Sequence, residues 1–99
     1  MGISPLPRKV KFGMWVGEVI DEVSCQRDFE NVDCLFLIQQ IRWSDDYDTI
    51  RFAYYTKPHG SSEEEWGYAN RPPNMEPGAL KELMQKAKGK SWFKHILNS

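Results

Sequence analysis

The sequence predicts a small two-layer α+β domain, in which a three-stranded antiparallel meander packs one face against two helices. A chain of 99 residues is the length of one domain. Strand-like segments follow one another in its middle, and segments with helical spacing stand at both ends, giving the order α-β-β-β-α. We expect residues 12–99 to form this domain. Residues 1–11 hold two prolines and three basic residues without periodicity, which is typical of a flexible arm.

The first helix is expected over residues 12–24. A strand is the alternative, because apolar and other residues also alternate from Phe12 to Val16. The alternation fails at Glu18, whereas the helical spacing continues to Val23, so the helix is favoured. The apolar residues that this spacing places on one helical face are Phe12, Trp15, Val16, Val19, Ile20 and Val23.

Three strands are expected in the middle of the chain. Residues 32–43 are rich in β-branched and aromatic side chains. They are apolar at both odd and even positions, which is typical of a strand covered on both faces. The polar turn 44–48 joins them to a second strand at 49–57, so the two form a β-hairpin. Residues 66–71 are the third strand, and the two prolines that follow end it because proline has no N–H to donate.

The second helix is expected to begin near Pro77, since the missing N–H of proline costs nothing in a first turn. Gly89 is suited to end it. Residues 91–97 form either a further short helix or a tail that packs on the sheet. The apolar stripe of the main helix comprises Leu80, Leu83, Met84 and Ala87.

Charge and cysteine content narrow the function classes. The net charge is −1, whereas a dedicated nucleic-acid binder usually carries a basic excess. No apolar run is long enough for a membrane helix, and no apolar signal segment follows Met1, so we expect a cytoplasmic protein. Cys25 and Cys34 form no CxxC pair and have no Cys/His cluster around them. Free thiols and no zinc site are expected.

Catalysis is not expected, and neither is a cofactor or a metal ion. The sequence has no nucleophile motif and no glycine-rich phosphate loop. The acidic turn 44–48 lacks the glycine and the distal glutamate of a calcium loop. His59 stands on a predicted loop, where a carboxylate such as Glu64 could make it an acid–base group. A small-ligand or enzymatic site around His59 is therefore the third alternative for function.

The aromatic content favours a non-catalytic protein-interaction module. Tyr54 and Tyr55 are adjacent on a strand, so their rings point to opposite faces, and Tyr55 shares its face with Arg51. Tyrosine, tryptophan and arginine dominate the hot spots of protein interfaces. We expect the partner to be another protein or a second copy of the chain in a homodimer. The predicted contact residues are Arg51, Tyr55, Trp66, Tyr68 and Arg71.

Nucleic-acid binding is the rival hypothesis. The basic arm and the C-terminal lysines would contact phosphates, although the balanced overall charge disfavours this function. The residues that would carry it are Arg8, Lys9, Lys11, Lys86, Lys88 and Lys90.

Overall fold

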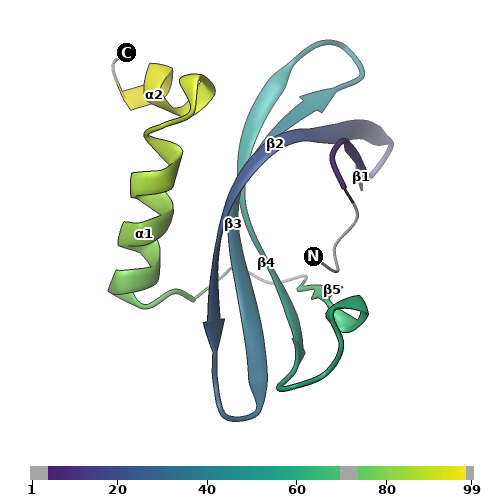
Figure 1. Cartoon of the computed structure of the whole chain (residues 1–99). Coiled ribbons are helices and arrows are strands. Elements are labelled where there is room, and N and C mark those ends of the chain that lie inside the picture. Colours follow the sequence, from purple (N-terminus) through teal and green to yellow (C-terminus); the bar gives the residue numbers. More distant parts are fainter. Residues whose placement is uncertain (1–4, 70–73, 98–99) are drawn as a thin grey trace.

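The computed structural model describes residues 5–69 and 74–97. Five antiparallel strands form one sheet in chain order, and two helices follow them at the C-terminal end (Figure 1). The elements are β1 (Arg8–Phe12), β2 (Trp15–Asp28), β3 (Val32–Trp43), β4 (Asp48–Pro58), the 3-10 turn η1 (Glu63–Glu65), β5 (Gly67–Tyr68), α1 (Pro77–Ala87) and α2 (Ser91–Leu97).

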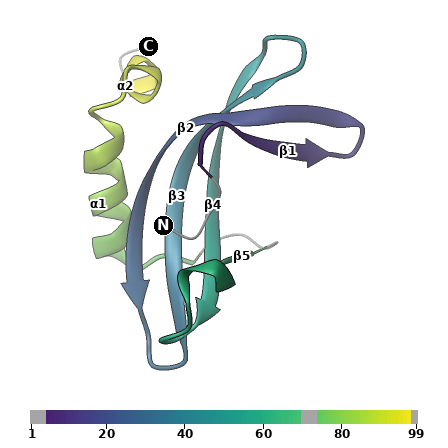
Figure 2. The ribbon, with the colours of Figure 1, turned by 45° about the vertical axis from the view of Figure 1, so that its right-hand side comes forward.

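The sheet curls into a half-barrel with the helices on its convex side. Figures 1 and 2 show β2 bending over at one end, so that β1 hooks back above the open, concave side. At the other end, β5 and η1 lie along β4 on the same open side. The concave face therefore has no helical layer among the described residues.

The predicted fold is wrong in its helices and in its number of strands. The sheet has five strands instead of three, and the expected order α-β-β-β-α does not occur, because both helices follow the sheet. Residues 12–24, expected as a helix, end β1, form its turn and begin β2. Residues 8–11 of the expected arm belong to strand β1, and Arg8 is buried. Strands β3 and β4 and helix α1 lie where they were predicted.

A β-bulge in β2 explains why the helical spacing misled the prediction. Val19 pairs with Ile41 and Asp21 pairs with the preceding residue Gln40, so Ile20 is an extra residue without a partner in β3. Before Ile20 the odd-numbered residues of β2 face the concave side, and after it the even-numbered residues do. Val19 is buried on the concave face and Val23 on the helical face, a pattern that resembles one stripe of a helix.

Strand β3 is buried on both of its faces. Every residue from Asp33 to Gln39 is buried, as the two-sided apolar pattern predicts. On the convex side, Phe36 and Ile38 pack against α1 and α2. The concave side of the same strand presents Leu37 and Ile41, which are almost fully inaccessible although no helix covers them. The curl of the sheet takes the place of a second layer.

The remaining expectations concern the ends of the chain. The third predicted strand, 66–71, is reduced to the two residues of β5, and residues 70–73 lie outside the described residues. Residues 91–97, left open between helix and tail, form the helix α2. Within the described residues, neither helix has the length and apolar character needed to cross a membrane.

Gly17 allows β2 to approach β3 closely, so its replacement by alanine should destabilise the fold. A Cβ at Gly17 would lie 2.7 Å from Cε3 of the Trp43 ring and 3.0 Å from the Arg42 carbonyl oxygen. We expect Gly17→Ala to lower the free energy of unfolding by roughly 1–3 kcal/mol, measured by urea denaturation. Gly67→Ala is the control, because its Cβ would meet the Thr56 carbonyl oxygen at 3.9 Å, an ordinary contact. Equal stability of the two variants would contradict this role of Gly17.

Candidate functional site

A chain of side-chain contacts crosses the concave face and links all five strands. Arg8 of β1 donates a hydrogen bond to Glu22 of β2, and Gln39 of β3 donates another to the same carboxylate oxygen at 3.0 Å. Arg51 of β4 donates to the Gln39 amide oxygen at 2.9 Å. The Arg51 guanidinium also lies 5.0 Å from the ring centroid of Tyr68 in β5. This polar chain spans the curled sheet from one edge to the other.

The centre of the polar chain is shielded from water. Gln39 is fully buried, and the side chains of Arg8 and Glu22 are 9% and 11% exposed. Nε and Nη1 of Arg8 have no hydrogen-bond partner among the described residues. Glu22 is therefore the group that offsets the desolvated charge of Arg8 in this part of the chain, and the loss of either would leave the other charge buried.

Three of the predicted contact residues meet on this face. Tyr55 and Tyr68 are paired across β4 and β5, with their rings edge to face at 5.6 Å, and Arg51 lies over Tyr68. Trp66 lies nearby in the chain, with the Lys57 ammonium 5.3 Å from its ring centroid and its indole N–H donated to Glu63. Arg71 lies outside the described residues. We call Arg51, Tyr55 and Tyr68 the tyrosine cluster.

His59 pairs with Asp33 instead of with a glutamate of the following turn. Its Nδ1 is 2.6 Å from one oxygen of the buried Asp33 carboxylate, and Lys57 donates to the other oxygen at 2.8 Å. These two hydrogen bonds, that from Lys57 first, lower the pKa of Asp33 to about 2. Lys57 also donates to the Ser61 carbonyl, and the Ser61 hydroxyl is donated to Pro58. The group anchors the loop after β4 and presents no activated hydroxyl.

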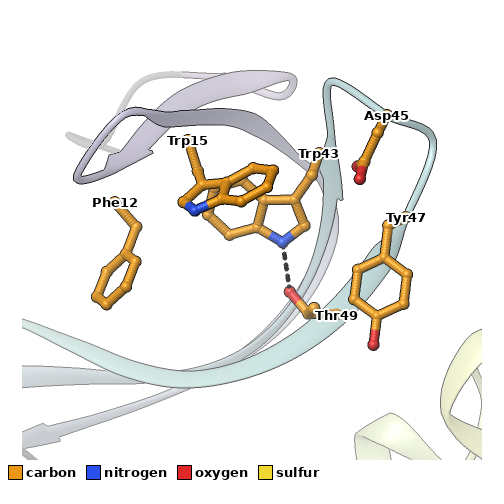
Figure 3. Close-up of a pocket in the computed structure, with 6 residues that line it drawn as sticks. All are labelled: Phe12, Trp15, Trp43, Asp45, Tyr47 and Thr49. Atoms are coloured by element: carbon orange, nitrogen blue, oxygen red, sulfur yellow. Dashed lines mark hydrogen bonds between the residues drawn. The ribbon is translucent and has the colours of Figure 1, made fainter.

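The concave face holds a pocket that is lined mainly by aromatic rings. Its volume is about 450 Å³, within the roughly 300–1,000 Å³ typical of ligand sites. It lies at the curled end of the sheet, where the β1–β2 turn and the β3–β4 turn come together (Figure 3). We call it the aromatic pocket, and its lining residues are Phe12, Trp15, Trp43, Asp45, Tyr47 and Thr49.

Three rings of the aromatic pocket are unusually exposed for side chains of their size. Phe12 is 76% exposed, Tyr47 65% and Trp15 55%. Trp43 is partly buried, and it donates its indole N–H to the Thr49 hydroxyl at 2.8 Å (Figure 3). One ring is thus fixed by the strand pair beneath it, while the other three stand around the opening with surface available to a ligand.

Asp45 brings one unpaired carboxylate to the aromatic pocket. Asp45 and Asp46 stand in the β3–β4 turn and Asp48 begins β4. Arg42 donates two hydrogen bonds of 2.9 Å to Asp48. The same hydrogen bonds lower the pKa of Asp48. Asp45 makes no side-chain hydrogen bond or ion pair with any residue in the described part of the chain. Its charge is available at the pocket wall (Figure 3).

The basic residues of the rival hypothesis do not form one surface with the aromatic rings. Lys9 and Lys11 alternate with the concave residues of β1, so they point to its other face. Lys86 forms an ion pair with Glu82 and Lys90 with Asp21, both on the helical side of the sheet. Lys88 follows α1, on the same side.

Sequence reasoning missed the aromatic pocket, because its residues come from two distant stretches, 12–15 and 43–49, that meet in the folded sheet. The helical spacing predicts a core-facing position for Phe12 and Trp15, and the polar composition of residues 45–47 predicts a turn. One signal was present: Gly13 separates aromatic residues at the β1–β2 turn and has a positive φ of 61°, which glycine adopts readily. A β-hairpin predicted over residues 8–19 would place Phe12 and Trp15 side by side. They are paired in this way between β1 and β2.

The comparisons with known proteins find no matching family model, no similar curated protein and no similar solved structure. Within residues 5–69 and 74–94, His, Cys, Asp and Glu side chains form no group of three that could hold a metal ion. The site is therefore interpreted from its own geometry.

The Asp33 group predicts a pH dependence of stability. Because the carboxyl pKa falls from 3.8 to about 2 on folding, its ionised form stabilises the fold above about pH 4, and this contribution is lost as the pH falls through about 2. The free energy of unfolding of Asp33→Asn, measured by denaturant titration, should fall less steeply than that of the wild type over this range. Asp28 is the exposed partner of Asp33 in β2. The free energy of unfolding of Asp28→Asn should change with pH as that of the wild type does. Identical slopes for Asp33→Asn and the wild type would contradict the assignment.

Proposed function

We propose that the protein is a non-catalytic binding module that holds a ligand group in the aromatic pocket. The observation that carries this proposal is the convergence of three exposed rings on one cavity of about 450 Å³. Large aromatic side chains normally bury most of their surface in the core or in an interface. Rings that line an open pocket in a small protein offer that surface to a ligand.

The absence of an acid–base pair among the pocket residues supports a binding role over catalysis. Among the described lining residues, Asp45 is the single carboxylate, and no histidine, cysteine or lysine accompanies it. The Asp33–His59 pair lies at the opposite end of β4 and holds a loop in place. General acid–base catalysis needs positioned groups within hydrogen-bond reach of the reacting atoms. The pocket is built to hold a group and not to transform it.

The tyrosine cluster extends the same face toward a protein partner. Thr49 of the pocket and Arg51 of the cluster are two residues apart on β4, so they share its concave face. A partner protein whose ligand group enters the pocket would reach Tyr55 and Tyr68 along the sheet. Arginine and tyrosine are the residue types on which such contacts depend most. A second copy of the chain is one form that this partner can take.

The placement of charges favours this proposal over nucleic-acid binding. The lysines of the nucleic-acid hypothesis lie on faces away from the pocket rings, while Asp45 lines the pocket and its neighbour Asp46 stands beside it. Carboxylates at the rim repel a phosphate backbone, whose neutralisation by basic residues supplies most of the affinity in such complexes.

The two cysteines support a reducing, cytoplasmic setting for the module. Cys25 and Cys34 are buried as free thiols in the core between the sheet and the helices. Burial raises the pKa of both thiols, which keeps them in the unreactive protonated form.

The four tryptophans make the proposal testable by NMR. Two indole N–H signals report on the pocket, from Trp15 and Trp43, and two lie outside it, from Trp66 and Trp92. We expect titration with small neutral, cationic and anionic probes to move the Trp15 and Trp43 signals for at least one probe class and to leave the other two in place. Each signal is assigned from the corresponding Trp→Phe variant. Probes that move only Trp66 or Trp92, or none of the four, would overturn the proposal.

A further inference from the structure

The geometry points to an alkylated ammonium cation, such as a trimethylammonium group, as the ligand group of the aromatic pocket. This inference rests on the proposed function and names the chemistry that the same site selects. Aromatic ring faces carry a partial negative charge that attracts cations placed over them. The inference follows from three features of the pocket among the described residues: its rings contact no cation of the chain, its charged lining residue is the unpaired carboxylate of Asp45, and it offers few hydrogen-bonding groups.

The ring faces of the pocket are not used by the protein itself. The ring pairs in contact within the described residues are Phe36–Tyr54, Tyr55–Tyr68 and Trp92–Phe93, and none of them lies in the pocket. Phe12, Trp15, Trp43 and Tyr47, which line the cavity (Figure 3), are not members of these ring pairs. Four separate rings around one cavity can contact a single round cation from several sides.

Cations of the chain occupy rings elsewhere on the same face. The Arg51 guanidinium lies over Tyr68 at 5.0 Å, and the Lys57 ammonium lies over Trp66 at 5.3 Å. These are the cation–π contacts within the described residues, and neither involves a pocket ring. Cations of the chain thus lie over Tyr68 and Trp66 outside the pocket. Phe12, Trp15 and Tyr47, which are more exposed than Tyr68, have no such cation among the described residues.

The charges around the pocket favour a cation. Asp45 contributes a carboxylate to the wall and has no cation of its own, because Arg42 is taken by Asp48. Lys9 and Arg42 border a second hollow beside Trp43, together with Glu18 and Asp46, so the charges there balance. Strand alternation places Lys9 on the face opposite Phe12. An anion in the aromatic pocket would meet Asp45 without a compensating basic residue in the lining.

The scarcity of hydrogen-bonding groups selects an alkylated cation over a primary ammonium. The indole N–H of Trp43 and the hydroxyl of Thr49 are bonded to each other, so the ring faces form most of the lining. A primary ammonium would lose water from three N–H donors and find few acceptors. A trimethylammonium group has no N–H to satisfy, and its methyl groups spread the charge over an apolar surface that fits against rings.

Choline and its neutral analogue 3,3-dimethyl-1-butanol separate charge from shape, because the two molecules differ in the replacement of nitrogen by carbon. We expect choline to move the Trp15 and Trp43 indole signals with a dissociation constant in the millimolar range, and the neutral analogue to bind roughly tenfold more weakly. A short peptide with one trimethyllysine, titrated in parallel, distinguishes the two sources of the group. Tighter binding than choline assigns the cation to a protein side chain, and weaker binding assigns it to a free small molecule.

Two variants with matched controls test the named residues. Trp15→Ala should weaken choline binding about fivefold or more, and Asp45→Asn about two- to fivefold. Phe29→Ala and Glu30→Gln remove an exposed ring and an exposed carboxylate at the β2–β3 turn, the other end of the sheet from the pocket. Both controls should bind choline as the wild type does. Trp15→Phe keeps a ring at this position and should retain part of the affinity, and the thermal transition of each variant reports on folding.

The outcomes separate this inference from the proposed function. Equal binding of choline and 3,3-dimethyl-1-butanol at Trp15 and Trp43 would overturn the cation and leave the pocket as a binding site. The same holds if an anionic probe binds there more tightly than choline. Choline binding that Trp15→Ala and Asp45→Asn leave unchanged would place the cation elsewhere and overturn the inference. An absence of shifts at Trp15 and Trp43 with every probe would overturn both proposals.

Discussion

Glu22 holds the position on which the curled sheet depends. It is the carboxylate that balances the buried Arg8, and it accepts a hydrogen bond from Gln39, which in turn accepts one from Arg51. A buried arginine without a counter-ion costs several kcal/mol, so the edge strand β1 stays folded over the sheet only while this pair is intact. The polar chain thereby fixes the curvature from the first strand to the last.

The bulge in β2 is what brings Glu22 to the concave face. Regular alternation after Val19 would turn Asp21 to that face and Glu22 toward the helices. With Ile20 inserted, Glu22 pairs with Gln39 on the concave side, and Val23 faces the core formed with α1. Bulges also increase local twist and bend the strand, which fits the sharp turn of β2 at this end (Figure 2). One inserted residue sets both the side-chain chemistry and the shape of the sheet.

The aromatic pocket is a consequence of this curvature. β3 is apolar on both faces, and the helices cover one of them, so the sheet buries the other by bending over itself. The bend leaves the β1–β2 turn standing near the β3–β4 turn, where the strand ends diverge and the rings on them cannot close into a core (Figure 3). Gly17 leaves room for the Trp43 ring beside β2 in this region, because a Cβ there would lie 2.7 Å from Cε3 of the ring.

The elements that were predicted correctly are those that a short sequence pattern determines. The two-sided apolar run gave the bounds of β3, and Pro77 marked the first turn of α1. The alternation of side chains along a strand was enough to place Arg51 and Tyr55 on one face, where Tyr68 contacts them. The first half of β2 could not be predicted in this way, because the bulge interrupts the two-residue alternation of buried and exposed side chains.

The site was harder to predict than the fold, because its residues do not follow a local pattern. The exposed rings at the β1–β2 turn looked like core residues, since a sequence does not show whether an aromatic side chain serves packing or binding. The contribution of Asp45 to the pocket depends on a turn that meets those rings only in the curled sheet.

The most direct test of this account is the free energy of unfolding of Glu22→Gln, measured by denaturant titration beside Glu18→Gln. The first variant keeps the shape of the side chain and removes the counter-ion of Arg8, while Glu18 is exposed on the same strand. The account predicts a loss of about 3–5 kcal/mol for Glu22→Gln and a change within about 0.5 kcal/mol for Glu18→Gln. Two variants of equal stability would show that the curl does not depend on Glu22.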